Sequence, residues 1–428
     1  MLKNYVKIAF RMFWRHKFFT GVNLFGICIT LVVLMFAVII FDQEVGPIPP
    51  EIHADRTLYL RSIYVLQTSE QRSSTSSSGA SYAFLDRYVR RLETAENATV
   101  FSRSPSYRNL RDGGEDASVE VRLTDGAYWQ VFRFDFRQGR PYTDDEVESG
   151  DFVAVIKASF SKRFFGSEAV VGKSVPIDGE NYRVVGVVAD PIGGNTYSDV
   201  WVPVTTDPPK KWRSYAIVGN FAAAVLARQS ADIEPIRAEF ATVLEQVEPP
   251  PDARSARVEV AAPLLTKFEG WMLGVVGGLS ARDFVTSGNK QQLVTVHVWQ
   301  NMIVVGICLL LIMLLPALHH VNLNIGRIEE RAAEIGVRRA FGGSVRTLMG
   351  QFVMENVLLT LIGGVLSLPC VWGVMVLSFH VYLDTGVLLR TFFYGLLMAV
   401  VFGAISGAYP AWKMARLNPV QALTGREN

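Results

Sequence analysis

A Gly-Lys-Ser triplet at 172–174 is the part of the sequence most suggestive of nucleotide chemistry. A phosphate-binding P-loop has the pattern G-x-x-x-x-G-K-[ST], in which backbone N–H groups surround the phosphates and the lysine reaches them. Here five residues, not four, separate Gly166 from Gly172. The stretch that follows alternates and reaches Asp178-Gly179, a pair typical of a hairpin turn, whereas a P-loop opens into a helix. The sequence therefore predicts a β-hairpin here, and no other P-loop pattern occurs in the chain.

Other catalytic or metal-binding constellations are equally weak. The 6 histidines are scattered, and no pair has metal-ligand spacing beside acidic residues. The 3 cysteines, Cys28, Cys308 and Cys370, all fall inside apolar runs, so none can form a disulfide in the polar middle of the chain. We expect a non-catalytic chain with no metal site and no cofactor of its own.

Apolar residues make up 50% of the chain and concentrate near the N-terminus and in the last third. A hydrocarbon core of about 30 Å needs roughly 20 helical residues. The first run is too long for the apolar part of a cleaved signal peptide, and no Ala-x-Ala-like site follows it. The net charge of +2 implies no general attraction to nucleic acid. We predict four transmembrane helices, at 18–41, 297–318, 351–379 and 390–411.

Basic residues predict the orientation, because cytoplasmic loops carry an excess of Lys and Arg. They cluster before the first span, between the second and third, and after the fourth: Lys3, Lys7, Arg11, Arg15, Lys17, Arg327, Arg331, Arg338, Arg339, Arg346, Lys413, Arg416 and Arg426. The short loop 380–389 has Asp384 and no basic residue. Residues 1–17, the loop 319–350 and the tail 412–428 are therefore predicted to be cytoplasmic, and 42–296 to lie outside.

The cytoplasmic loop has helical spacing. Glu334 precedes Arg338 by four residues, which suits an ion pair on one helix face. Ile328, Ala332 and Ile335 form an apolar stripe at helical intervals. From these patterns alone, a solvated linker with membrane-proximal charge is as good an interpretation as a docking helix.

This loop resembles that of the MacB/FtsX-type permease subunits of ABC transporters, which typically reads E-R-x-x-E-I-G-x-R-x-A-x-G-A. The match comprises Glu330, Arg331, Glu334, Ile335, Gly336, Arg338, Ala340 and Gly342, and it departs at Gly343, where alanine is usual. The resemblance implies a coupling helix seated on a separate ATPase subunit, which would bind ATP and Mg. Together with Arg339, the matching residues are the predicted ATPase-coupling site, and Glu334, Arg338 and Arg339 are its foremost members.

Both ends of the chain agree with this resemblance. Residues 1–17 resemble the family's N-terminal start and have the basic and apolar faces of an amphipathic helix on the inner membrane surface. The C-terminal stretch resembles the family's closing A-x-x-x-P-x-x-A-L pattern, although Asn418 and Gln421 stand where acids are common. Gly403 and Gly407 form a G-x-x-x-G pattern, which predicts close helix packing, either within this chain or with another.

Strand-like and helix-like segments alternate through 42–296, which predicts an α+β domain. The fold class is therefore a membrane protein with four transmembrane α-helices and an α+β extracytoplasmic domain between the first two. The resemblance implies a porter-like α/β part with an inserted β-rich lobe, roughly 124–204.

Two local features of this domain lead to further predictions. The serine-rich stretch 73–79 predicts a flexible loop. Aromatic residues are predicted to lie in the hydrophobic core, among them Tyr128, Trp129, Phe132, Phe134 and Phe136.

By resemblance, the chain is expected to be the permease subunit of a MacB-like ABC transporter, multi-pass in the bacterial inner (cytoplasmic) membrane. It would couple ATP hydrolysis by a separate ATPase chain to movements of its outer domain for export. A second permease copy or paralogue completes the expected dimer, with a periplasmic membrane-fusion protein and an outer-membrane channel as further expected partners. Two alternatives stay open: an FtsX-like transmembrane signal transmitter that regulates an envelope enzyme, and a lipoprotein-releasing permease.

Overall fold

The computed structural model divides the chain into two compact units, one formed by residues 1–41 and 305–428 and the other by 42–304. Each is described by itself. The structure describes residues 11–400 except 12, 16, 69–72, 113–114, 192–195, 208–215, 248–256, 278–279, 288–289, 331–336, 338–344, 380–388 and 398–399.

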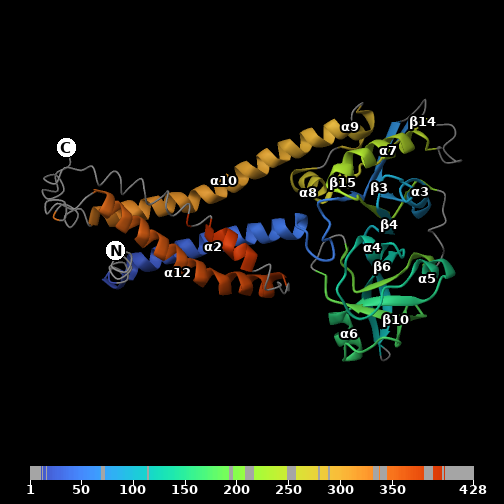
Figure 1. The fold of residues 1–428 in the computed structure, drawn as a ribbon, viewed down its shortest axis with the longest axis horizontal. Helices are drawn as coiled ribbons and strands as arrows, with labels where there is room; N and C mark the ends of the chain where they lie inside the picture. Colours follow the sequence, from blue (N-terminus) through green and yellow to red (C-terminus); the bar gives the residue numbers. More distant parts are fainter. Residues whose placement is uncertain are drawn as a thin grey trace. The chain divides into compact units, whose positions relative to one another are not determined.

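Long helices dominate the first unit (Figure 1). They are α2 (Lys17–Val45), α10 (Lys290–Glu330) and α12 (Val345–Phe379), of which α2 and α10 continue into the second unit. Thr20–Val45 and Met354–Met375 are long and apolar enough to cross a membrane. They correspond to the predicted first and third spans, whereas the spans predicted at 297–318 and 390–411 are not confirmed. The predicted amphipathic helix lies mostly outside the described residues.

Helices α2 and α12 pack closely. Leu31 and Leu359 are buried in one shared cluster, and Met35 and Met375 are buried in a second. A Cβ added at Gly363 would lie 2.5 Å from Cγ2 of Ile27, so this position of α12 requires glycine for the helices to approach.

The second unit contains both strands and helices, which confirms its predicted α+β class. Strand β13 pairs with both β1 and β4, and β14, β2 and β3 pair in that order. The elements outside the insertion are β1 (Thr57–Leu60), β2 (Ile63–Thr68), β3 (Ser73–Ala80), α3 (Tyr82–Tyr88), β4 (Asn97–Ser102), β13 (Phe221–Leu226), α7 (Ile233–Glu245), β14 (Arg257–Ala261), β15 (Leu265–Thr266), α8 (Lys267–Val276) and α9 (Ala281–Thr286).

An inserted lobe interrupts this unit between two hydrogen-bonded strands. Residues 97–102 of β4 pair antiparallel with 221–226 of β13, so the chain leaves at Ser102 and returns at Phe221. The lobe, which contains most of the green segments in Figure 1, therefore starts earlier and ends later than the predicted 124–204. Its elements are β5 (Ser106–Asp112), β6 (Glu115–Thr124), α4 (Tyr128–Val131), β7 (Phe136–Gly139), α5 (Asp144–Ser149), β8 (Val153–Lys157), α6 (Ala158–Phe165), β9 (Ser174–Ile177), β10 (Glu180–Val188), β11 (Val200–Pro203) and β12 (Val218–Gly219).

The Gly-Lys-Ser segment is the predicted hairpin. Strands β9 and β10 pair antiparallel around Asp178 and Gly179, whose φ angles are 50° and 88°. Two successive residues with positive φ are the mark of a type I′ turn. Lys173 Nζ lies over the ring of Phe165, 5.3 Å from its centroid, which is a cation–π contact. The segment has no helix after its serine and so lacks the geometry of a P-loop.

The flexible loop predicted at 73–79 is wrong. These residues form β3, which pairs with β2 from Ile63↔Ser78 to Thr68↔Ser73. Serine-rich composition favours flexibility in an isolated segment. Here the backbone hydrogen bonds to β2 stabilise an extended strand, so the partner strand overrides the local preference.

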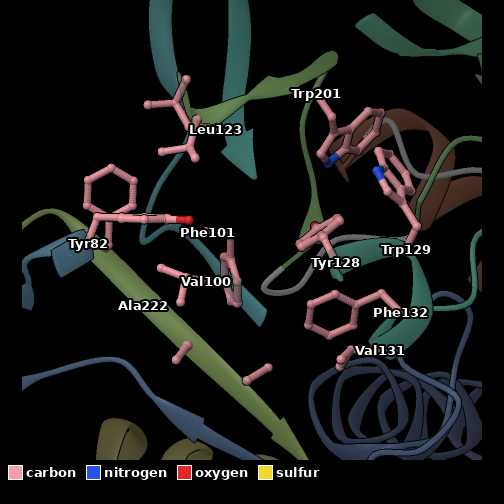
Figure 2. Packing of buried hydrophobic residues seen from close by; sticks show 14 of the residues in the cluster. Tyr82, Val100, Phe101, Leu123, Tyr128, Trp129, Val131, Phe132, Trp201 and Ala222 are labelled. Atoms are coloured by element: carbon pink, nitrogen blue, oxygen red, sulfur yellow. The ribbon is translucent and has the colours of Figure 1, made fainter. Parts of the chain in front are cut away.

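Aromatic residues form the core where the lobe joins the rest of the unit (Figure 2). Trp201 and Tyr128 are fully buried, and Phe132, Phe101 and Trp129 nearly so. Tyr128 makes edge contacts with Phe132 and Phe101, at centroid distances of 4.8 Å and 5.6 Å. The core prediction for Tyr128, Trp129 and Phe132 is confirmed. Because β11 supplies Trp201 and β4 supplies Phe101, this cluster joins lobe and base.

Helix α5 shows how local charge stabilises the lobe. Thr143 and Glu146 form a reciprocal capping box, and Arg140 donates to both carboxylate oxygens of Glu146 at 2.8 Å. The hydrogen bonds from Arg140, followed by one from the Thr143 backbone, lower the pKa of Glu146 from 4.5 to about 2.

Trp201→Ala should lower the free energy of unfolding by about 3–5 kcal/mol, because it leaves a large cavity in a closely packed core. Thermal unfolding of the detergent-purified chain measures this, with exposed Tyr107→Ala as the matched aromatic control. A Trp201→Ala variant as stable as the control would contradict the assigned core.

Glu146→Gln should lower the unfolding temperature at neutral pH, and the difference from wild type should shrink as pH falls from about 5 towards 2. The folded-state pKa lies below the ordinary value, so the stabilisation is present above pH 4.5 and is lost as Glu146 protonates. Unfolding temperatures measured across this range test it, with Glu148→Gln on the same helix as control. A pH-independent difference would show that the charge of Glu146 is not the cause.

Candidate functional site

The predicted coupling residues lie almost entirely outside the described part of the chain. Glu330 is the last residue of α10. Arg331, Glu334, Ile335, Gly336, Arg338, Arg339, Ala340 and Gly342, with the packing pair Gly403 and Gly407, are not among the described residues. The coupling site and the G-x-x-x-G pair therefore stay predictions.

A different site is built around helix α8, at the start of which Thr266 and Glu269 form a capping box. Glu269 N donates to Thr266 Oγ1 at 3.2 Å, and Thr266 N donates to Glu269 Oε2 at 2.8 Å. Such reciprocal bonds satisfy backbone donors that the first helical turn leaves open. Strand β15, just before the helix, pairs with β1 at Leu58↔Thr266. The start of α8 is thus anchored to the sheet.

A buried ion pair connects α8 to the end of α2. Lys267 Nζ lies 2.7 Å from Glu51 Oε2, and the two side chains are 7% and 3% exposed. The same ammonium donates to the backbone carbonyls of Gln43 at 3.2 Å and Gly46 at 3.4 Å. A buried charge needs both a counter-charge and hydrogen-bond partners. Lys267 finds them in the last turn of α2, at Gln43, and in the segment that follows this helix, at Gly46 and Glu51.

A second ion pair connects α8 to α7. Arg237 Nη2 lies 2.5 Å from Glu269 Oε2, and Arg237 Nε donates to the carbonyl of Leu264 at 3.1 Å. Both side chains are largely buried, at 11% and 17% exposure. Glu269 therefore both caps α8 and binds α7, whose Ile236 and Phe240 are buried in the main core.

Helix α10 is also held by α8. Asn301 Nδ2 donates to the carbonyl of Met272 at 2.9 Å, and this bond is buried. Val294 and Val298 of α10 share an apolar cluster with Met272 and with Phe284 of α9. We call the contacts of α8 with α2, α7 and α10 the α8 joint; its members are Glu51, Arg237, Lys267, Glu269 and Asn301.

Sequence reasoning missed all five of these residues. The T-x-x-E pattern at 266–269 could have predicted the capped start of α8. Nothing local could have predicted that Glu51 meets Lys267, because the two lie far apart in the chain. Among the residues that the structure describes, no group of three or more His, Cys, Asp or Glu residues could hold a metal ion.

Comparison with known families covers both halves of the chain. The family model described as MacB-like periplasmic core domain matches residues 20–243, and the one described as FtsX-like permease C-terminal matches 306–419.

Full-length relatives agree with these matches. The chain is 23% identical over 368 residues to a Bacillus subtilis protein named uncharacterized ABC transporter permease YknZ, covering 84% of each. It is 28% identical over 320 residues to the macrolide export ATP-binding/permease protein MacB 1 of Yersinia pestis, covering 73% of this chain and 44% of the relative. The pyoverdine export ATP-binding/permease protein PvdT of Pseudomonas fluorescens is 24% identical over 430 residues, with coverage of 98% and 59%. The chain thus spans about half the length of these two ATP-binding/permease relatives.

Among solved structures, a domain of a putative permease from Porphyromonas gingivalis is similar with a TM-score of 0.40 and 18% identity, covering 50% of this chain and 90% of that one. The periplasmic core model alone matches more than half of the chain, and the permease model matches most of its last third. The chain belongs to the MacB/FtsX-type family of ABC transporter permeases.

Proposed function

We propose that this chain is the non-catalytic permease subunit of an exporter in the bacterial inner membrane, and that the α8 joint transmits movement between its spans and its outer domain. The observation that carries the proposal is that one short helix contacts two long helices. Lys267 donates to the carbonyl of Gln43 in the last turn of α2, and the carbonyl of Met272 accepts from Asn301 of α10.

The contacts of the α8 joint are suited to passing a displacement from one helix to the next. Its polar contacts are buried and charge-assisted, and such contacts hold a narrower geometry than exposed ones. A displacement of α2 or α10 reaches α8, and the Arg237–Glu269 pair passes it to α7 and the main core. We infer that these helices move the outer domain as a body.

ATP hydrolysis is assigned to a separate chain. The sequence has no P-loop pattern, and the segment that comes nearest to one is the hairpin β9–β10. We therefore propose that a partner ATPase binds ATP and Mg and contacts the 330–342 loop. The proposed assembly has two permease copies or paralogues with both termini cytoplasmic. A periplasmic membrane-fusion protein and an outer-membrane channel are its proposed further partners.

Export is the better-supported class of function. Two relatives carry export in their names, for a macrolide and for pyoverdine. The outer unit, 42–304, is also the larger of the two compact units of the chain. These observations favour export over regulation of an envelope enzyme and over lipoprotein release, and they leave the substrate unassigned.

Glu51→Gln should lower the free energy of unfolding by about 3–5 kcal/mol, because it leaves the buried Lys267 ammonium without its counter-charge. The double variant Glu51→Leu with Lys267→Met should recover most of this stability, since apolar residues of similar volume replace a buried pair at little cost. In this double variant, ATP should still fail to move the outer domain, because no ammonium then binds the carbonyls of Gln43 and Gly46. Thermal unfolding measures the stability.

Coupling is measured as the ATP-dependent change in distance between spin labels at exposed Ser149 in the two copies of the assembled complex, with the 3 native cysteines replaced by serine. Arg137→Gln, which removes an exposed ion pair, is the matched control. If the double variant moves as wild type does, the α8 joint is not the transmission path.

Glu334→Arg combined with Arg338→Glu should reduce the ATPase that copurifies with the chain by at least about tenfold, because the variant reverses both charges of the predicted contact while keeping the internal pair. Purification from the native host in mild detergent, followed by quantification of the ATPase, measures the loss. The control is Glu259→Gln in β14 of the outer unit, which should leave copurification unchanged. Undiminished copurification would remove these residues from the ATPase contact.

A further inference from the structure

A cavity of about 580 Å³ lies between α8 and the turn that joins β1 to β2. This volume is within the range of about 300–1,000 Å³ that is usual for sites of small molecules. Arg61 and Ser62 line it from the turn, Arg103 lines it from the end of β4, and Gly270 and Trp271 line it from α8. All of its lining residues belong to the 42–304 unit.

The charge of the cavity is predominantly positive. Arg103 donates to Ser62 Oγ at 3.4 Å, which places its guanidinium beside the turn that carries Arg61. The pKa of Arg61 is lowered, first by partial removal from water and then by the positive charge of Arg103. Of the other charged lining residues, Lys267 is paired with Glu51, and Glu44 is exposed to solvent. The negative charges of Glu51 and Glu44 act on Arg61 in the opposite direction and offset part of the effect of Arg103. Two guanidinium groups held close together favour an anion between them, with carboxylate or phosphate as the best geometric match.

The lining of the cavity also contains aromatic side chains that suit an apolar body. Tyr64 packs against Phe284 with ring centroids 5.2 Å apart, and Trp271 adds a second aromatic side chain to the lining. Gly270 and Gly274 are one helical turn apart on α8, and a Cβ added at either would meet nothing within 4 Å. The α8 side of the cavity is therefore open along a full turn.

We propose that this cavity binds an anionic amphiphile, with its carboxylate or phosphate group between Arg61 and Arg103 and its apolar body along the glycine face of α8. Glu44 belongs to the last turn of α2, whose residues 20–45 form a candidate span, so the ligand has two sources: the bilayer and the surrounding solution. Thr266 and Lys267 line the cavity and also belong to the start of α8. The bound ligand therefore contacts the α8 joint, and its binding does not depend on the proposed ATPase partner.

The test uses the full chain in nanodiscs of phosphatidylcholine, without any ATPase, and measures fluorescence of dansylated undecanoic acid as it binds. Saturable binding is expected, and the uncharged amide of the same probe should bind at least tenfold more weakly. Gly270→Leu should weaken binding at least tenfold by filling the cavity. Leucine has a higher helix propensity than glycine, so α8 should stay folded. Arg103→Gln should weaken binding similarly, whereas Arg103→Lys should restore part of it.

Arg137→Gln, an exposed arginine of the inserted lobe, is the matched control and should bind as wild type does. Adding phosphatidylglycerol to the nanodiscs separates the two sources: displacement of the probe supports a bilayer lipid as the ligand, and undiminished binding supports a soluble amphiphile. The proposal is overturned if the acid and its amide bind equally well, or if Gly270→Leu, shown to be folded by thermal unfolding, binds the acid as tightly as wild type. Absence of saturable binding to the wild-type chain overturns it as well.

Discussion

The buried pair of Lys267 and Glu51 is the contact on which the arrangement of the outer unit's base depends. Each side chain is almost fully removed from water, and either charge alone would be strongly unfavourable there. The pair therefore requires the segment after α2 and the first turn of α8 to stay together. Because the same turn is capped by Glu269 and paired to β1 through β15, the sheet, α7 and α2 converge on one short helix.

A second constraint comes from the pairing of β4 with β13. Six paired positions close the base of the outer unit around a long insertion, so the lobe is attached by two adjacent strands. Aromatic packing of Trp201, Tyr128 and Phe101 then fills the junction (Figure 2). Dense packing of large rings resists relative movement of lobe and base. This packing supports the proposal that the outer domain moves as one body.

Helix α8 combines two roles on its faces. One face carries the ion pairs and the Met272 carbonyl that bind α2, α7 and α10. Another carries Gly270 and Gly274 and opens onto the cavity with Arg61 and Arg103. A ligand in that cavity would thus contact the helix that, in the proposed function, transmits movement to the outer domain. Binding can alter a movement only to the extent that the ligand favours one state over the other.

The sequence alone determined features whose physical cause is local. Apolar runs indicated the candidate spans in α2 and α12, and Asp178-Gly179 indicated the hairpin. Only the tertiary structure decided that 73–79 is a strand, because β2 supplies its hydrogen bonds. It alone also decided the bounds of the insertion and the α8 joint, since Glu51 and Lys267 are brought together by the path of the whole domain. Local patterns report on backbone preference and burial, whereas such pairings depend on where distant segments meet.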